Sequence, residues 1–233
     1  MKAIVIIPAY NEEKNIKSVV ESIYDLNINV DVLVINDDSS DDTLKEAQKT
    51  KAIVLNLISN LGIGGAVQSG YIYALKNNYD IAIQVDGDGQ HDPKYLKIMI
   101  NKILNENYHM VIGSRFIEKT EYKQTFFRML GIKITSILIK ILTGKKIYDT
   151  TSGYRAINRE IIEIFAKDYP YDYPEPTTNM NIILRKKNIL EIPVEMKNRV
   201  NGKSSITPLK SIKYMVKVIL SLFVEKIRKG EFI

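Results

Sequence analysis

The sequence predicts an α/β fold in which helices cover both faces of a mostly parallel central sheet. Two observations lead to this prediction. Continuous apolar runs, typical of strands buried on both faces, alternate with segments whose apolar residues recur at helical spacing. The alternation occurs at least four times between residues 3 and 115, which favours strand–helix–strand units over separate blocks of helices and strands.

Five apolar segments are expected to form the strands. The first, KAIVIIPAY, is almost continuously apolar, and the fourth, DIAIQVD, runs directly into an acidic, glycine-rich turn. Segments of this length that are rich in Val and Ile are typical of strands. The expected strands are residues 2–10, 30–36, 52–58, 80–86 and 109–115.

Four helices are expected between these strands. The first carries apolar residues at helical spacing, and the second begins with Ser and Asp residues that can cap its amino end. The third begins with glycines, and the fourth has Pro93 near its first turn, where proline is tolerated. The expected helices are residues 11–26, 39–50, 64–78 and 92–107.

Two apolar helices are expected after residue 115, where the alternation stops. Residues 126–142 carry an apolar stripe flanked by Lys133 and Lys140: Phe126, Leu130, Ile134, Ile137 and Ile141. Residues 207–229 carry a second stripe, also bordered by lysines: Leu209, Ile212, Val216, Ile219, Phe223 and Ile227. Either both stripes face the protein core, or the two helices lie in a membrane interface with the lysines at headgroup level.

Composition limits the domain organisation and the kinds of site. The 233 residues fit one catalytic-sized domain, expected at residues 1–205, followed by a basic amphipathic helix at 206–233. The lack of cysteine excludes disulfides, zinc–thiolate sites and cysteine nucleophiles. No signal peptide is evident, and no window approaches the roughly 18 uninterrupted apolar residues of a membrane-spanning helix.

The net charge of +6 is concentrated at the carboxyl end. From Arg185 onward, 12 basic and 4 acidic residues give +8, which leaves −2 for the rest of the chain. A basic tail on a near-neutral body indicates an anionic partner at that end, such as a membrane surface or a phosphate. We do not expect nucleic acid, because no recognition motif accompanies the charge.

The acidic turn DGDGQ suits a divalent metal ion. Asp86 and Asp88 are two residues apart at a strand end, so their carboxylates face the same way, and Gln90 adds an amide oxygen. An EF-hand loop counted from Asp86 would need Gly and Glu where His91 and Lys97 stand. A turn that merely ends the strand is the alternative. We expect His91 to cap or pack rather than bind metal.

Two further segments fall at the same edge of the predicted sheet. A carboxylate of Asp37 or Asp38 could accept the imide N–H of a uracil, although residues 39–42 also cap the next helix. The glycines of NLGIGGAVQSGY, beginning at Gly62, open a helix whose free amides favour phosphate, although a turn explains them equally well. The first strand ends without glycine, so no dinucleotide-binding fingerprint is present.

Together these motifs resemble a known family. The segments IIPAYNEE, NDDSSDDT, NLGIGGAVQSGY, DGDGQHDP, GSR and DTTSGYRAI, in this order, resemble family 2 glycosyltransferases of the GT-A (nucleotide-diphospho-sugar transferase) fold. The resemblance covers residues 3–205. Its DGDGQHDP and SGYR forms are similar to the polyprenyl-phosphate branch, the relatives of dolichyl-phosphate mannose synthase.

The resemblance implies roles for the residues that bind the donor. It implies that Mg²⁺ or Mn²⁺ is held on the donor diphosphate by Asp86, Asp88 and Gln90. It implies that the nucleotide is contacted by Pro8, Tyr10, Glu12, Asp37, Gly62 and Asp86. This chain has Asn-Asp-Asp-Ser at residues 36–39 where the family commonly has Asp-Asp-Gly-Ser, and we align Asp37 with the base-contacting residue.

The resemblance also implies an acceptor-phosphate site and a catalytic aspartate. The residues implied to bind the acceptor phosphate are Arg115, Arg128, Arg199 and Lys203; for Arg128 an ordinary surface charge is the alternative. Asp149 falls where the family places a base-like aspartate, and we group it with Asp88 and Arg155 as catalytic. A phosphate acceptor is already ionised near neutral pH, so Asp149 would then orient the acceptor or complete the metal site, and Arg155 would hold Asp149 or a phosphate.

The expected function is metal-dependent, inverting transfer of a sugar from a nucleoside diphosphate, UDP rather than GDP, to a polyprenyl phosphate. We expect a cytoplasmic protein, peripheral on the inner face of the cell membrane and held there by its amphipathic helices or by a small membrane protein. One alternative is a soluble transferase that acts on a saccharide or protein hydroxyl in surface polysaccharide synthesis. Another is a catalytically silent subunit that binds sugar nucleotides.

Overall fold

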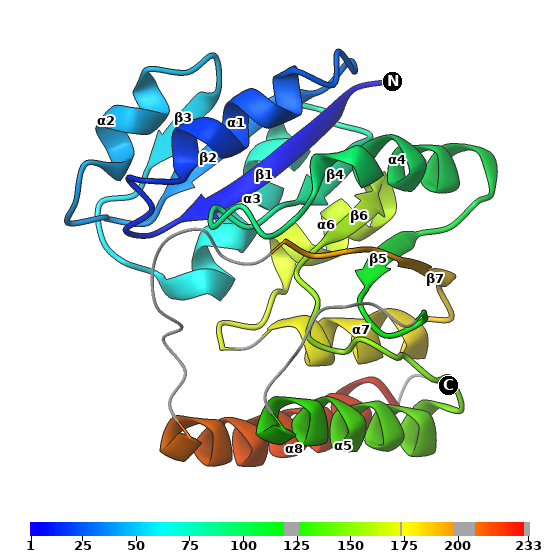
Figure 1. The fold of residues 1–233 in the computed structure, drawn as a ribbon. Helices are drawn as coiled ribbons and strands as arrows, with labels where there is room; N and C mark the ends of the chain where they lie inside the picture. Colours follow the sequence, from blue (N-terminus) through cyan, green and yellow to red (C-terminus); the bar gives the residue numbers. More distant parts are fainter. Residues whose placement is uncertain (119–125, 173, 198–207, 231–233) are drawn as a thin grey trace.

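The computed structural model describes residues 1–118, 126–172, 174–197 and 208–230 (Figure 1). A seven-stranded sheet forms its centre, with the strand order β3-β2-β1-β4-β6-β5-β7. Strand β6 runs antiparallel to its neighbours β4 and β5, and all other pairs are parallel. The predicted α/β fold with a mostly parallel sheet is therefore confirmed.

The first five strands lie where the apolar runs predict them. They are β1 (Ala3–Ala9), β2 (Asp31–Asn36), β3 (Ile53–Asn56), β4 (Ile81–Gln84) and β5 (Met110–Ser114). Every residue of β1, β4 and β5 is buried, as expected for apolar strands covered on both faces. The four helices between them are α1 (Ile16–Tyr24), α2 (Thr43–Gln48), α3 (Gly62–Lys76) and α4 (Leu96–Asn105), with a short 3₁₀ turn, η1 (Pro93–Tyr95), before α4.

The second half of the chain adds elements that the sequence pattern did not predict. They are β6 (Arg155–Asn158), α6 (Arg159–Lys167), α7 (Pro174–Leu184) and β7 (Ile189–Pro193). The strand β6 has only four residues and enters the sheet between β4 and β5. It brings the preceding loop, residues 147–154, to the same edge as the predicted metal-binding turn.

Helices cover both faces of the sheet, as predicted. One apolar core joins the sheet to α1, α2 and α4, and the other joins it to α3, α6 and α7. Two more helices, α5 (Phe126–Thr143) and α8 (Pro208–Gly230), lie outside α7 on the second face (Figure 1). No helix in the described ranges combines the length and hydropathy needed to cross a bilayer.

Helix α8 is docked on the body of the protein. It packs against α7 and α5 and buries Val218 and Leu222. The buried Glu225 carboxylate accepts a hydrogen bond of 2.5 Å from the Asn181 amide on α7. These contacts fix which side of α8 faces the protein.

The described members of the two predicted apolar stripes are exposed, except Ile219 on α8, which is half-buried. On α5 the inward positions are Ile132, Thr135, Ser136 and Ile139. The exposed positions include, on α5, Leu130, Ile134, Ile137 and Ile141, and, on α8, Val216, Leu220, Phe223, Val224 and Ile227. We call these nine side chains the outer apolar face. The side chains of Phe126, Leu209 and Ile212, also predicted for the stripes, lie outside the described residues.

Candidate functional site

The site lies at the carboxyl ends of β1, β2, β4 and β5, where open α/β sheets bind ligands. The ends of these strands are tied together by main-chain contacts: the Asp37 amide donates to the Ala9 carbonyl at 2.9 Å, and the Val85 amide to the Ile6 carbonyl at 3.0 Å. The predicted polar segments therefore converge at one edge of the sheet.

The turn after β4 holds its two aspartates in different environments. Asp88 is buried, and its Oδ1 accepts the Gln90 amide at 3.0 Å. Asp86 keeps 38% of its side chain exposed, so its carboxylate borders the open side of the turn. Gly89 sits in the left-handed region at φ +76°, which permits this tight turn.

Gly153 lies close to the Asp86 carboxylate, and its lack of a side chain leaves room for that carboxylate. A Cβ atom added at Gly153 would lie 2.9 Å from Gln84 Nε2 and 3.1 Å from Asp86 Oδ1. Glycine in the SGYR segment is therefore required for the observed position of Asp86.

The oxygen ligands of this turn fit Mg²⁺ or Mn²⁺. Two carboxylates and the Gln90 amide are hard donors of the kind that Mg²⁺ takes together with substrate phosphates. Within the described ranges no three His, Cys, Asp or Glu side chains gather as a metal-binding group. The fit is thus to a metal shared with a bound diphosphate, rather than to a cage made by protein side chains alone.

His91 packs beside the turn. Its ring stacks on Tyr154, with 4.7 Å between ring centroids, and its Nδ1 accepts the Asp86 amide at 3.0 Å. The ring is buried. These contacts agree with the packing role expected from the sequence.

Asp37 holds the amino end of α3. Its Oδ1 accepts the Leu61 amide at 2.7 Å, and its main-chain carbonyl accepts the Asn60 side chain at 3.0 Å. Burial raises the pKa of Asp37, and the Leu61 and Gly62 amides partly offset that rise. Asp37 therefore has a structural role at the predicted nucleotide site, and its contact with a nucleobase stays a prediction.

The segment after β1 lies against the metal-binding turn. A Cβ atom at Gly87 would be 3.1 Å from the Pro8 carbonyl oxygen and 3.6 Å from a side-chain carbon of Glu12. The Glu12 amide donates to Thr43 Oγ1 at 2.7 Å, which fixes this segment, while the Tyr10 side chain is exposed. The structure thus brings Pro8 and Glu12, two residues predicted to bind nucleotide, next to the turn that carries the three residues predicted to bind metal.

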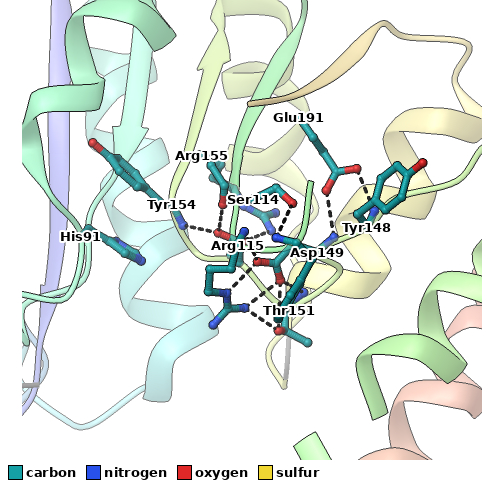
Figure 2. Close-up of polar contacts among 12 residues, drawn as sticks. His91, Ser114, Arg115, Tyr148, Asp149, Thr151, Tyr154, Arg155 and Glu191 are labelled. Carbon is teal, nitrogen blue, oxygen red and sulfur yellow. Dashed lines mark hydrogen bonds and ion pairs between the residues drawn. The ribbon is translucent and has the colours of Figure 1, made fainter. Parts of the chain in front are cut away.

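Arg115 and Asp149 form a buried, two-pronged ion pair (Figure 2). Arg115 Nε lies 2.7 Å from Asp149 Oδ2, and Arg115 Nη2 lies 2.7 Å from Asp149 Oδ1. The Arg115 amide also donates to Oδ2, and Nη2 reaches Thr151 Oγ1 at 2.9 Å. Both oxygens of the base-like aspartate are therefore occupied by Arg115, which was predicted only as a phosphate ligand.

Arg155 lies beneath the site and does not hold Asp149. Its side chain is fully buried; Nη1 donates to Thr178 Oγ1 at 2.8 Å and Nη2 to the Ser152 carbonyl at 2.7 Å. The expected partnership of Arg155 with Asp149 is taken by Arg115 instead. Arg155 pairs with Gln84, the last residue of β4, and its side chain bonds Thr178 on α7 rather than Asp149.

Sequence reasoning missed Glu191 on β7. Its carboxylate accepts the Tyr148 amide at 2.7 Å and the Asp149 amide at 2.8 Å (Figure 2). Burial raises the pKa of Glu191, and these hydrogen bonds, with one from Ser114, partly offset the rise. The signal in the sequence is a single acid within the apolar run ILEIP.

The side chains of three residues predicted to bind the acceptor phosphate lie outside the described part of the structure. Arg199 and Lys203 fall outside the described residues, and for Arg128 only the backbone, within α5, is described. The chain leading to Arg199 lies against the metal-binding turn, because the Lys197 amide donates to the Gln90 carbonyl at 2.9 Å. The Gln90 side-chain amide donates to the Lys197 carbonyl at 3.3 Å.

Comparison with known proteins agrees with this architecture. The "Glycosyl transferase family 2" profile matches residues 4–165. The chain is 31% identical over 210 residues to the UDP-N-acetylglucosamine–dolichyl-phosphate N-acetylglucosaminyltransferase of Methanococcus voltae, covering 82% of this chain and 83% of the relative. It is 27% identical over 219 residues to the polyprenol monophosphomannose synthase of Mycolicibacterium smegmatis, covering 88% and 81%.

The fold is also shared with a solved glycosyltransferase. Glucosyl-3-phosphoglycerate synthase from Mycobacterium tuberculosis, determined with Mn²⁺, UDP and glucosyl-3-phosphoglycerate, superposes with a TM-score of 0.72. The match covers 96% of this chain and 79% of that protein, at 20% identity, and it confirms the GT-A fold. The profile match over most of the chain, together with these relatives, establishes that this protein is a glycosyltransferase of family 2.

Proposed function

We propose that this glycosyltransferase moves one sugar from UDP to a polyprenyl phosphate held at a membrane surface. The observation that carries the proposal is the state of Asp149. A hydroxyl acceptor needs a general base to remove its proton, and Asp149 is fully buried with both oxygens bound by Arg115. A phosphate acceptor arrives already ionised, since its second pKa is about 6, and needs no such base.

The relatives support the lipid acceptor. Both of those named above carry a polyprenyl acceptor in their names, and one of them also names a UDP-sugar donor. The nucleotide-binding residues are proposed to be Pro8, Tyr10, Glu12, Asp37 and Gly62. A UDP donor is in keeping with the Asp37 carboxylate, which could accept the imide N–H of a uracil beside the amino end of α3.

Asp86, Asp88 and Gln90 are proposed to hold Mg²⁺ or Mn²⁺ against the donor diphosphate. When bound, the ion would neutralise charge that develops on the leaving diphosphate. The protein's own task is then to fix geometry: the turn orients the donor, and Arg115, with Arg128, Arg199 and Lys203, is proposed to orient the acceptor phosphate. Attack by the phosphate oxygen on the face opposite the leaving group would invert the anomeric centre in one displacement.

The outer apolar face supports a location at the membrane surface. Nine large apolar side chains of α5 and α8 are exposed, and Lys133 and Lys140 are exposed on α5. Exposed apolar residues bordered by lysines are typical of helices that lie in an anionic membrane interface. The names of the relatives point to no membrane-protein partner, and the proposal requires none. We place the protein peripherally on the cytoplasmic side of the membrane, where it would meet its nucleotide-sugar donor.

The test is transfer of radiolabel from a panel of nucleotide sugars to undecaprenyl phosphate, read as counts extracted into organic solvent. Mn²⁺ and EDTA samples are run in parallel. The proposal expects metal-dependent organic-phase counts with at least one UDP-sugar. Counts that are equal in EDTA would contradict the metal role, and no counts with any donor would contradict the lipid acceptor.

A further inference from the structure

The loop that carries Asp149 is held from two sides. From β7, Glu191 accepts the amides of Tyr148 and Asp149. From α5, the Thr135 hydroxyl lies 2.6 Å from the Thr150 hydroxyl, and the Ser136 hydroxyl donates to the Ile147 carbonyl. The loop has little freedom to move, so the position of Asp149 depends on these anchors.

The anchor on β7 is chemically unusual. Glu191 lies opposite Ile112 in the β5–β7 pair, near the end of the sheet where Arg115 begins the next segment. Its partners are two main-chain amides and the Ser114 hydroxyl, and within the described residues it forms no ion pair with Lys or Arg. Glu191 is half-buried. Partial desolvation of a carboxylate without a cation costs free energy, and this burial together with the nearby Asp149 charge raises the pKa of Glu191.

The ionised Glu191 carboxylate accepts both main-chain donors at this position. Two N–H groups converge on the two Glu191 oxygens at 2.7 and 2.8 Å. A glutamine would turn its NH₂ group towards one of these amides, so one donor would lose its acceptor and meet another donor. A glutamine therefore cannot accept from both amides as the carboxylate does, and the loop is expected to shift in the E191Q variant.

We propose that Glu191 is a positioning residue for the transfer reaction. By fixing the main chain at Tyr148 and Asp149, Glu191 fixes the Asp149 carboxylate, and through it the guanidinium of Arg115. Arg115 is the described arginine proposed to meet the acceptor phosphate, so the inference rests on the proposed function. Glu191 itself touches no substrate in this account.

The consequence is specific to the acceptor side of the site. The metal-binding turn follows β4 and the nucleotide residues follow β1 and β2, and none of them contacts Glu191 among the described contacts. Loss of the Glu191 carboxylate is therefore expected to slow transfer while leaving donor binding intact. Loss of a residue that only stabilised the fold would lower both transfer and donor binding.

The experiment compares Glu191→Gln with Glu195→Gln. Glu195 is a matched control, because it lies two residues past β7 and makes only exposed contacts, including a 3.0 Å pair with Lys94. Measured are kcat, the KM for the nucleotide sugar, the dissociation constant of UDP with Mn²⁺, and the melting temperature. E191Q is expected to lower kcat by about tenfold or more, because small misplacements of an orienting group cost that much or more, and to leave UDP affinity unchanged. E195Q is expected to match the wild type.

Ser114→Ala serves as the second variant. It removes the hydroxyl partner of Glu191 and makes a smaller change to the core; a fall in kcat with unchanged UDP affinity is expected. If E191Q does not fold, this variant decides the question. Equal kcat for E191Q and E195Q would overturn the inference, as would a loss of UDP affinity parallel to the loss of kcat. If the wild-type protein transferred sugar to no lipid phosphate, the proposed function would be contradicted, and this inference would be contradicted with it.

Discussion

Arg115 and Asp149, 34 residues apart in the sequence, meet through two hydrogen bonds of 2.7 Å in a site where both side chains are buried. The pair joins the end of β5 to the loop before β6. Because each guanidinium–carboxylate contact is charge-assisted and the geometry is two-pronged, the pair fixes orientation as well as proximity. It lies where the acceptor phosphate is proposed to bind.

Replacing Asp149 with Asn is expected to lower both stability and transfer. Asn keeps the size of the side chain but removes the carboxylate that pairs with the buried Arg115 guanidinium; breaking a buried pair typically costs about 3–5 kcal/mol. Urea unfolding and organic-phase transfer measure the two effects. Asp172→Asn is the control, because Asp172 forms an exposed pair with Lys217, worth about 1 kcal/mol or less. If D149N behaved like D172N in both assays, Asp149 would have no role in the site.

Gly153→Ala is expected to weaken metal-dependent nucleotide binding. The added methyl would lie 3.1 Å from Asp86 Oδ1, so the carboxylate must shift by a few tenths of an ångström. Titration calorimetry with UDP, with and without Mn²⁺, measures the change; we expect about a tenfold loss with Mn²⁺, by analogy with disturbed ligand-orienting contacts. Gly131→Ala is the control, because its methyl meets only the flexible end of Met215. If G153A bound UDP with Mn²⁺ as tightly as the wild type, a role for Asp86 in the metal site would be contradicted.

Stability should depend on pH through Glu191. Its pKa in the folded protein is raised above the ordinary value of 4.5, chiefly by burial, with Asp149 adding to the rise. A raised folded pKa means that the folded state binds the proton more tightly, so the contribution is most favourable below pH 4.5 and declines as pH rises through the folded pKa. The difference in unfolding free energy between wild type and E191Q should therefore shrink as the pH increases. Urea curves for both proteins from acid to neutral pH give this difference, and parallel pH profiles would contradict the prediction.

The outer apolar face can be tested by one substitution on α5. Ile141 is 73% exposed there, whereas Ile58, after β3 and away from α5 and α8, is 99% exposed. Cosedimentation with vesicles that contain anionic phospholipid is expected to fall by about tenfold for Ile141→Glu, since burying one such side chain contributes about 1.5–3 kcal/mol. Ile58→Glu should bind like the wild type. Equal losses in both variants would argue that the contact is not made by α5.

The sequence predicted the first half of the fold well. Strands β1 to β5 are continuous apolar runs, and the motifs between them fall at strand ends, so placing Asp37, Asp86 and Asp88 at one edge required only the parallel arrangement. Such patterns are local and can be recognised from the residues alone. The metal-binding turn is an example, because its two aspartates share one short segment.

The second half depends on contacts between distant segments. The strand β6 has four residues and runs antiparallel between β4 and β5. The Arg155 side chain at its start bonds Thr178 on α7, while Asp149 in the preceding loop reaches Arg115. Helix α5 is apolar on most sides, so its inward face is set by the bonds of Thr135 and Ser136 to the Asp149 loop. Neither the place of β6 in the sheet nor the inward face of α5 can be derived from residue spacing within one segment.

The central claim, transfer to a lipid phosphate, is tested most directly by changing only the acceptor's head group. Wild-type protein with Mn²⁺ and an active radiolabelled UDP-sugar is given undecaprenyl phosphate in one reaction and undecaprenol in the other, in the same detergent. Because Asp149 is buried with both oxygens bound by Arg115, we expect organic-phase counts with the phosphate and none above background with the alcohol. Equal counts with both acceptors, or counts with the alcohol alone, would contradict it.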